Sequence, residues 1–148
     1  MRSSILSVLP EAEKYNIEIL FETALPPDDF RSFLEGFSHP SIGANFDTGN
    51  SASLGYHPNY EIRTLGPFIR NIHIKDRIYG GGTVPLGKGN ADFVKIFQSL
   101  SEIEYQGDFI LQTARDPDHV GVAVKYQSMV SEWISRFLEK EKINHHPL

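Results

Sequence analysis

Four short apolar segments, each followed by a helical pattern, constrain the fold of this chain more than any other feature. They are predicted as β-strands and cover residues 17–23, 42–48, 69–76 and 108–113. Strands that alternate with helices pair in parallel through right-handed crossovers. We therefore predict an α/β fold of the order α(βα)₄, with parallel strands and the helices on the outer face of the sheet.

Each predicted strand carries a polar, metal-capable residue near its carboxyl end. Alternate residues of a strand point to opposite faces. In the third strand, Ile72 and Ile74 share the apolar face and His73 lies on the other. The corresponding residues of the four strands are Glu22, Asp47, His73 and Gln112. Parallel α/β barrels build their sites at this end of the strands, so these side chains are predicted to share one site.

The segments between the strands contain helical patterns. Apolar residues at helical spacing predict helices over residues 3–15, 28–37, 58–66, 91–103 and 118–140. Pro58 suits the first position of the third helix, and Asn90 is predicted to cap the fourth. Residues 48–50 are predicted to form a turn and residues 140–148 a frayed tail. The Gly-rich segment 78–90 is predicted to be a loop over the site, either a lid or an ordinary mobile loop.

Composition narrows the class of protein. The chain has 148 residues, of which 40% are hydrophobic and 22% charged, which predicts one globular domain over residues 1–148. It has no Cys, which excludes disulfides, zinc–thiolate sites and thiol nucleophiles. A formal net charge of −5 argues against nucleic acid as a partner. No apolar stretch approaches the roughly 20 residues of a membrane helix, so we expect a cytoplasmic protein.

Five short motifs occur in an order that resembles a known family. They are Phe21-Glu22, Asn45-Phe46-Asp47-Thr48-Gly49-Asn50, His73-Ile74-Lys75-Asp76, Val84-Pro85-Leu86-Gly87-Lys88-Gly89 and Leu111-Gln112-Thr113-Ala114-Arg115. With these motifs the chain resembles the sugar phosphate isomerase/epimerase family of xylose isomerase-like TIM barrels. Ketose 3-epimerases, inosose dehydratases and the trinuclear-zinc AP endonucleases belong to the same superfamily. The resemblance covers about residues 17–115.

The resemblance implies a fold and a metal site. The family forms a full (β/α)₈ barrel, and this chain resembles its second half, a (β/α)₄ half of a TIM barrel. In the family, these four strands supply Glu, Asp, His and Glu to one divalent metal ion. Carried over, the ligands are Glu22, Asp47, His73 and Gln112, and Mn²⁺, Mg²⁺, Co²⁺ or Zn²⁺ would suit them. Gln112 departs from the pattern, because an amide can offer a carbonyl oxygen but cannot act as a base.

The resemblance also implies a reaction. A metal-dependent isomerase or epimerase of a sugar or sugar phosphate would transfer a proton next to a carbonyl through a metal-bound enediolate. Glu22 would be both a ligand and the catalytic base, and Lys75, Arg115 and Asn50 would contact the substrate. Two alternatives stay open at this point: Lys75 as a solvated strand-end residue, and Arg115 in a surface ion pair with a neighbouring aspartate.

The sequence also allows functions other than an isomerase or epimerase. Gln112 and the missing strands favour a catalytically silent barrel half that acts as an interaction or folding module. A hydrolase or dehydratase on the same metal site is a third reading. The nuclease branch is set aside, because Gly81 and Thr83 stand where two of its additional metal ligands would be. Four strands leave two sheet edges open, so we expect a homo-oligomer or a separate N-terminal barrel half.

Overall fold

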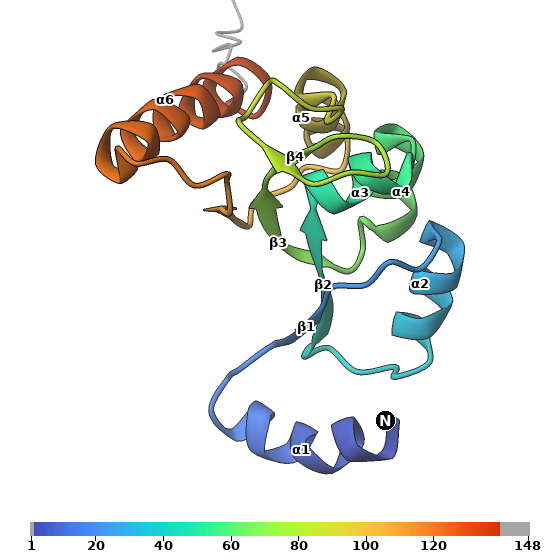
Figure 1. Ribbon diagram of the computed structural model, residues 1–148. Coiled ribbons are helices and arrows are strands. Elements are labelled where there is room, and N and C mark those ends of the chain that lie inside the picture. The colour runs from blue at the N-terminus through green and yellow to red at the C-terminus, as the bar shows by residue number, and fades with distance from the viewer. Residues whose placement is uncertain (1, 140–148) are drawn as a thin grey trace, which may run out of the picture.

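The computed structural model describes residues 2–139, in which helical segments separate the four predicted strands (Figure 1). Four strands form one sheet in the order β1-β2-β3-β6, and each neighbouring pair is parallel. Their bounds are Ile19–Phe21 (β1), Ile42–Asp47 (β2), Ile69–Ile74 (β3) and Asp108–Leu111 (β6). The prediction of an α/β half barrel with parallel strands is confirmed.

Residues 2–139 contain six helices, and four of them form a layer on one face of the sheet. Their bounds are Arg2–Lys14 (α1), Pro27–Glu35 (α2), Thr48–Leu54 (α3), Pro58–Leu65 (α4), Phe93–Glu102 (α5) and His119–Phe137 (α6). Helix α2 contacts α4, α4 contacts α5, and α5 contacts α6, so these four helices follow one another around the sheet. Helix α1 lies near the amino ends of the strands (Figure 1). None of the helices within residues 2–139 is both long and apolar enough to cross a bilayer.

The hydrophobic core lies between the sheet and this helix layer. Ile72 and Ile74 of β3 are fully buried, as are Ile62 of α4 and Phe97 of α5. The apolar face of each strand was predicted to pack on helices, and these residues follow that pattern. The opposite face remains open, and its side chains become polar toward the carboxyl ends of the strands.

Two helices begin at other residues than predicted, because side-chain hydrogen bonds cap their amino ends. Residues 48–50 were predicted to be a turn, but they begin α3, because the side chain of Asp47 accepts a hydrogen bond from the Asn50 backbone amide and caps the helix. Asn90 was predicted to cap α5, but Asp92 does so by accepting from the Lys95 amide. The frayed tail predicted for 140–148 lies outside the described residues.

The Gly-rich segment is anchored by a buried carboxylate. The third strand ends at Ile74, and Asp76–Arg77 instead forms a separate strand, β4, antiparallel to Thr83–Val84 (β5). Asp76 is fully buried and accepts hydrogen bonds from the backbone amides of Gly87, Gly89 and Ala91 at 2.8–3.1 Å. The segment predicted as a loop therefore begins with a small hairpin and ends tied to Asp76.

Candidate metal centre

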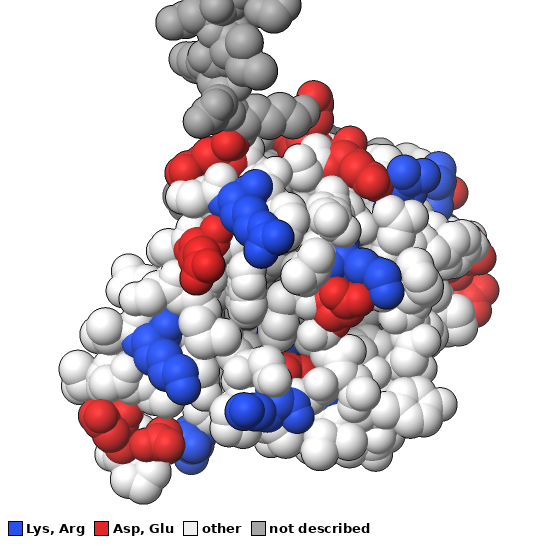
Figure 2. Space-filling model, turned by 90° about the horizontal axis from the view of Figure 1, so that it is seen from above, with Lys and Arg blue, Asp and Glu red and all other residues white. Residues whose placement is uncertain are grey.

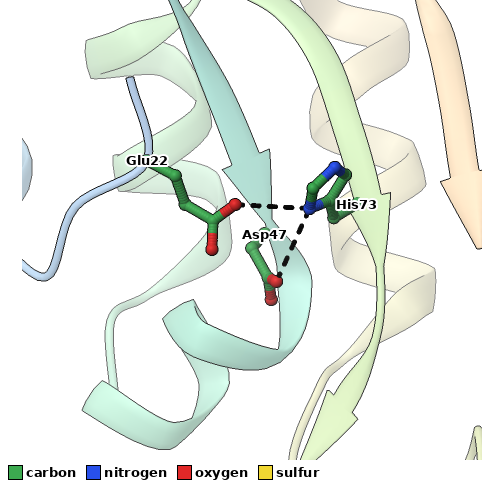
Figure 3. Close-up of side chains that lie close together, drawn as sticks. All are labelled: Glu22, Asp47 and His73. Carbon is green, nitrogen blue, oxygen red and sulfur yellow. Dashed lines mark ion pairs between the residues drawn. The ribbon is translucent and has the colours of Figure 1, made fainter. Parts of the chain in front are cut away.

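Three of the predicted ligands converge at the carboxyl ends of neighbouring strands. Glu22 follows β1, Asp47 ends β2, and His73 lies in β3 opposite Asp47 in the strand register. Their side chains point toward one another in Figure 3. One ligand atom from each lies within 4.8 Å of the others. Parallel pairing in this register is what brings residues far apart in the sequence to one point.

Asp47 is fixed by the helix that it caps. Its Oδ1 accepts from the Asn50 amide at 2.7 Å, which leaves Oδ2 free to face the site. That oxygen lies 4.0 Å from His73 Nδ1 and 3.4 Å from Lys75 Nζ. The side chain is 1% exposed, so solvent cannot take the place of these partners. One carboxylate thus both starts α3 and supplies an oxygen atom to the site.

Two asparagine amides hold the Glu22 carboxylate, one at each oxygen. Asn45 Nδ2 donates to Oε2 at 2.6 Å, and Asn50 Nδ2 donates to Oε1 at 2.7 Å. Each amide is held in turn, because Asn71 donates to the oxygen of Asn45 and Arg77 donates to the oxygen of Asn50, at 2.7 and 2.8 Å. The orientation of the carboxylate is therefore set by two chains of hydrogen bonds.

The contacts of His73 indicate which atoms of Glu22, Asp47 and His73, here called the triad, could bind a cation. The Asn45 amino group lies 3.0 Å from His73 Nδ1, and in the tautomer that carries its proton on Nε2 this nitrogen accepts from the amide. Glu22 Oε2, also an acceptor, lies 3.2 Å from the same nitrogen. Ligands that share an ion at 2.0–2.2 Å stand about 3 Å apart. Two facing acceptors with an Asp47 oxygen beside them therefore fit a divalent cation.

Lys75 lies inside the site and connects it to β6. Its Nζ donates to Gln112 Oε1 at 2.9 Å and lies close to Asp47. The side chain is half-buried, which disagrees with the alternative of a solvated strand-end lysine. A Cβ atom at Gly49 would stand 2.7 Å from Lys75 Cγ, so a residue without a side chain leaves room for it. The amide oxygen of Gln112 thus contacts the Lys75 ammonium group.

Arg115 is not brought to the triad. It is exposed, and within residues 2–139 no hydrogen bond or ion pair joins it to another residue. The alternative of an ion pair with a neighbouring aspartate is not observed either. Asp116 accepts from the Asp118 amide, and Asp118 caps α6. As a substrate contact, Arg115 stays a prediction.

A buried carboxyl group lies beside the site. Glu61 of α4 lines the same small pocket as Glu22 and Asp47, and the Ser51 hydroxyl of α3 donates to it. Burial raises the pKa of Glu61 to about 7, and the hydrogen bond from Ser51 lowers it in part. Its hydrogen bond with Ser51 joins α4 to α3, the helix that Asp47 caps.

Sequence reasoning assigned no role to three of the residues whose hydrogen bonds orient Glu22, namely Asn45, Asn71 and Arg77. Asn45 and Asn71 stand two positions before Asp47 and His73, on the same strand faces, so the period of two could have identified them. Arg77 gave no such signal, because it lies in β4, beyond the end of the third strand. Its guanidinium group also donates to the Gly81 carbonyl oxygen at 2.7 and 3.0 Å, which links the Gly-rich segment to Asn50.

Charges of both signs are interspersed around this end of the molecule. Figure 2 looks onto the molecule from above, the side toward which the strands run in Figure 1. Blue and red side chains alternate there, and among the described residues the visible face has no continuous basic area. This distribution is not that of a surface that follows a phosphate backbone.

Comparison with known proteins links this geometry to one family. Residues 1–132 match the family model described as xylose isomerase-like TIM barrel. An uncharacterized protein of Methanocaldococcus jannaschii is 24% identical over 95% of this chain and 52% of its own length. An inosose dehydratase of Geobacillus kaustophilus is 30% identical over 63% of this chain and 36% of its own length. The chain thus spans about half the length of these relatives, or less.

Solved structures share the fold. A xylose isomerase domain protein from Planctomyces limnophilus superposes with a TM-score of 0.81 at 22% identity, over 92% of this chain and 53% of its own. An L-ribulose 3-epimerase gives 0.76 at 17% identity, over 91% and 53%. The IOLI protein with a bound zinc atom gives 0.73 at 17% identity, over 94% and 58%. In each, the match covers a little over half of the larger chain.

Proposed function

The chain belongs to the xylose isomerase-like TIM barrel family, and we propose that it acts as a metal-dependent isomerase or epimerase of a sugar or sugar phosphate. The observation that carries this proposal is the convergence of Glu22, Asp47 and His73 within 4.8 Å at the carboxyl ends of three strands. The fold and the family agree with a sugar-modifying enzyme. The identity of the reaction is our inference from the site.

The donor set suits a divalent ion. Glu22, Asp47 and His73 would hold it, and Gln112 would become a fourth ligand if its oxygen turned away from Lys75. Two carboxylates and one imidazole are compatible with Mg²⁺, Mn²⁺, Co²⁺ or Zn²⁺. The zinc atom of the IOLI protein supports the proposal without identifying the metal of this chain. When bound, such an ion would polarise a substrate carbonyl and favour negative charge on its oxygen.

The side chains of this protein would then handle the proton. Glu22 is the carboxylate at the mouth of the site, and we assign it the role of base toward a C–H bond next to the carbonyl. Its two asparagine partners would keep it oriented during the transfer. Lys75 carries the positive charge closest to Asp47 and would stabilise negative charge on the substrate oxygen.

One observation favours a second reaction, the elimination of water. Gln112 cannot serve as a second base, and the group that it contacts is the Lys75 ammonium, a proton donor. A dehydratase needs a base for the C–H proton and an acid for the leaving hydroxyl group, so Glu22 and Lys75 would fill these two roles. Inosose dehydratases are among the relatives. Both reactions begin with the same proton abstraction by Glu22.

That shared step can be measured directly. The chain, loaded with Mg²⁺ or Zn²⁺, is incubated with ketoses, ketose phosphates and inososes in D₂O, and recovered sugars are analysed by mass spectrometry. We expect deuterium to enter at the carbon next to the carbonyl, with epimer or dehydrated product distinguishing the two reactions. Glu22→Gln should lower the exchange rate by roughly 100-fold or more.

Glu18→Gln is the matched control. Glu18 lies on the same strand face as Glu22 but pairs with Arg70, outside the triad, so the exchange rate should stay unchanged. Equal exchange by the Glu22→Gln and unmodified chains would remove Glu22 as the base. No exchange with any substrate would favour the alternative of a catalytically silent barrel half.

A further inference from the structure

An apolar groove lies between the last strand of the sheet and the last helix. It has a volume of about 650 Å³, and its lining includes Leu111 of β6 and Val120, Ala123, Val124, Val130 and Ile134 of α6. Together with Gln127, which also lines the groove, these helix residues follow one another at helical spacing and form one stripe. Val130 is buried, but Val120 and Val124 are 76% and 58% exposed. Thus β6 covers part of the apolar face of α6 and leaves the rest open.

The groove adjoins an open edge of the sheet. Within the described residues β6 pairs with β3 on one side and has no strand on the other. A free edge offers unpaired backbone donors and acceptors, and exposed apolar patches beside it mark interaction sites. A segment that fits here must add a strand to β6 and place apolar side chains between that strand and α6.

The opposite edge of the same sheet has these properties. Strand β1 pairs with β2 alone within the described residues. Ile19 lies on the strand face of Phe21, whose ring packs against Phe33 and Phe37 on the helix side, and Ile17 lies two residues before the strand. Ile17 is 55% exposed, and Ile19 is partly exposed. The edge of β1 therefore presents apolar side chains toward the layer in which the groove of a neighbouring copy would lie.

We propose that the β6–α6 groove binds the β1 edge of a second copy of this chain. The contact joins two different surfaces, and it closes into a ring after two copies, because four strands from each copy make eight. Eight parallel strands form a closed barrel whose interior side chains fill. Closure would enclose Ile110, now 48% exposed on the inner face, and remove both free edges.

Closure has a consequence for the two candidate metal centres. Glu22 follows β1, and Gln112 follows β6, so the new strand pair would place Glu22 of one copy next to Gln112 of the other. The two triads would lie on opposite sides of one barrel mouth. The interface does not depend on the proposed reaction, since it rests on the strand edges and the groove.

The test starts with the mass of the unmodified 148-residue chain in sedimentation equilibrium, where we expect a dimer. Val120→Asp with Val124→Asp should convert it to a monomer, because the charges would be buried in the groove. Val94→Asp is the matched control: Val94 is a similarly exposed valine on α5, at 44%, and is not part of the groove. Circular dichroism establishes that each variant is folded.

Cross-linking identifies the surfaces in contact. The chain has no Cys, so Ile19→Cys and Leu111→Cys each introduce a single thiol. A short bis-maleimide should join the two variants when they are mixed and refolded together, and should join neither variant to itself, because like positions lie across the barrel. A monomer, a dimer that survives the Val120→Asp/Val124→Asp change, or cross-links between like positions would each overturn the proposal.

Discussion

The centre of the sheet and its β6 end contain similar apolar residues, but these residues are buried at the centre and partly exposed at the β6 end. At the centre, β2 and β3 have strands on both sides and helices above, and their polar side chains are held by one another. At the β6 end, strand and helix are formed, but Val120 and Val124 on the apolar face of α6 are exposed. Secondary structure is thus set locally, whereas burial depends on the neighbour that each strand has.

The largest change in the free energy of unfolding is expected for an Ile→Ala substitution at the centre of the sheet, compared with the same substitution at the β6 end. Ile72 of β3 is fully buried, and Ile110 of β6 is half exposed. Ile72→Ala should lower the free energy of unfolding by about 4 kcal/mol, because it leaves a cavity in the core. Ile110→Ala should cost less than about 1 kcal/mol. Urea unfolding measures both free-energy changes in the Val120→Asp/Val124→Asp chain, which we expect to be a monomer. Equal decreases for the two substitutions would contradict the comparison.

The buried Glu61 makes the centre sensitive to pH. Burial raises the pKa of its carboxyl group from an ordinary value of 4.5 to about 7 in the folded chain. The folded state therefore binds the proton more tightly, and the stabilisation present below pH 4.5 is lost as the pH rises to about 7. The free energy of unfolding should fall by roughly 3 kcal/mol across this window.

Glu61→Gln isolates this effect. The amide oxygen can still accept from Ser51, but the side chain does not titrate. Urea unfolding measured at several pH values should therefore give a flatter profile for the variant between pH 4.5 and 7. Profiles of equal slope in the two chains would assign the pH dependence to other groups.

Arg77 tests whether the hydrogen-bond chains of the centre act on the ligands. Arg77→Met removes the donor to Asn50, which orients Glu22, and should weaken Mn²⁺ binding by roughly tenfold. Arg70→Met is the control, because Arg70 pairs with Glu18 away from the triad. Calorimetric titration gives both affinities. If the two variants bind Mn²⁺ equally, the hydrogen bonds from Arg77 through Asn50 do not orient Glu22 for metal binding.

Lys75 joins the two regions, and its substitution should have the smallest effect. Its ammonium group lies 3.4 Å from Asp47 Oδ2 and repels a cation at the triad. Lys75→Met should therefore strengthen Mn²⁺ binding by roughly threefold. The change would also release Gln112 from its hydrogen bond. Weaker binding in the same titration would mean that Lys75 supports the site more than it repels the ion.

The sequence predicted most of the fold and the three side chains that converge at the candidate metal centre. Alternation along the strands placed Glu22, Asp47 and His73 on one face, and parallel pairing brought them together. Side chains that act as caps were harder to predict. Asp47 and Asp92 each accept a backbone amide three residues on, which sets where the helices begin. Asp76 anchors a loop through amides 11 to 15 residues away, a contact without local periodicity.

The central claim is that Glu22, Asp47 and His73 form a metal site within this one chain. Metal-stripped protein is titrated with Mn²⁺ and Zn²⁺ by calorimetry, beside the His73→Ala chain. We predict one site per chain with micromolar or tighter affinity, lost in His73→Ala, which removes one of the three converging side chains. Absence of binding, or equal binding by the two chains, would contradict the claim.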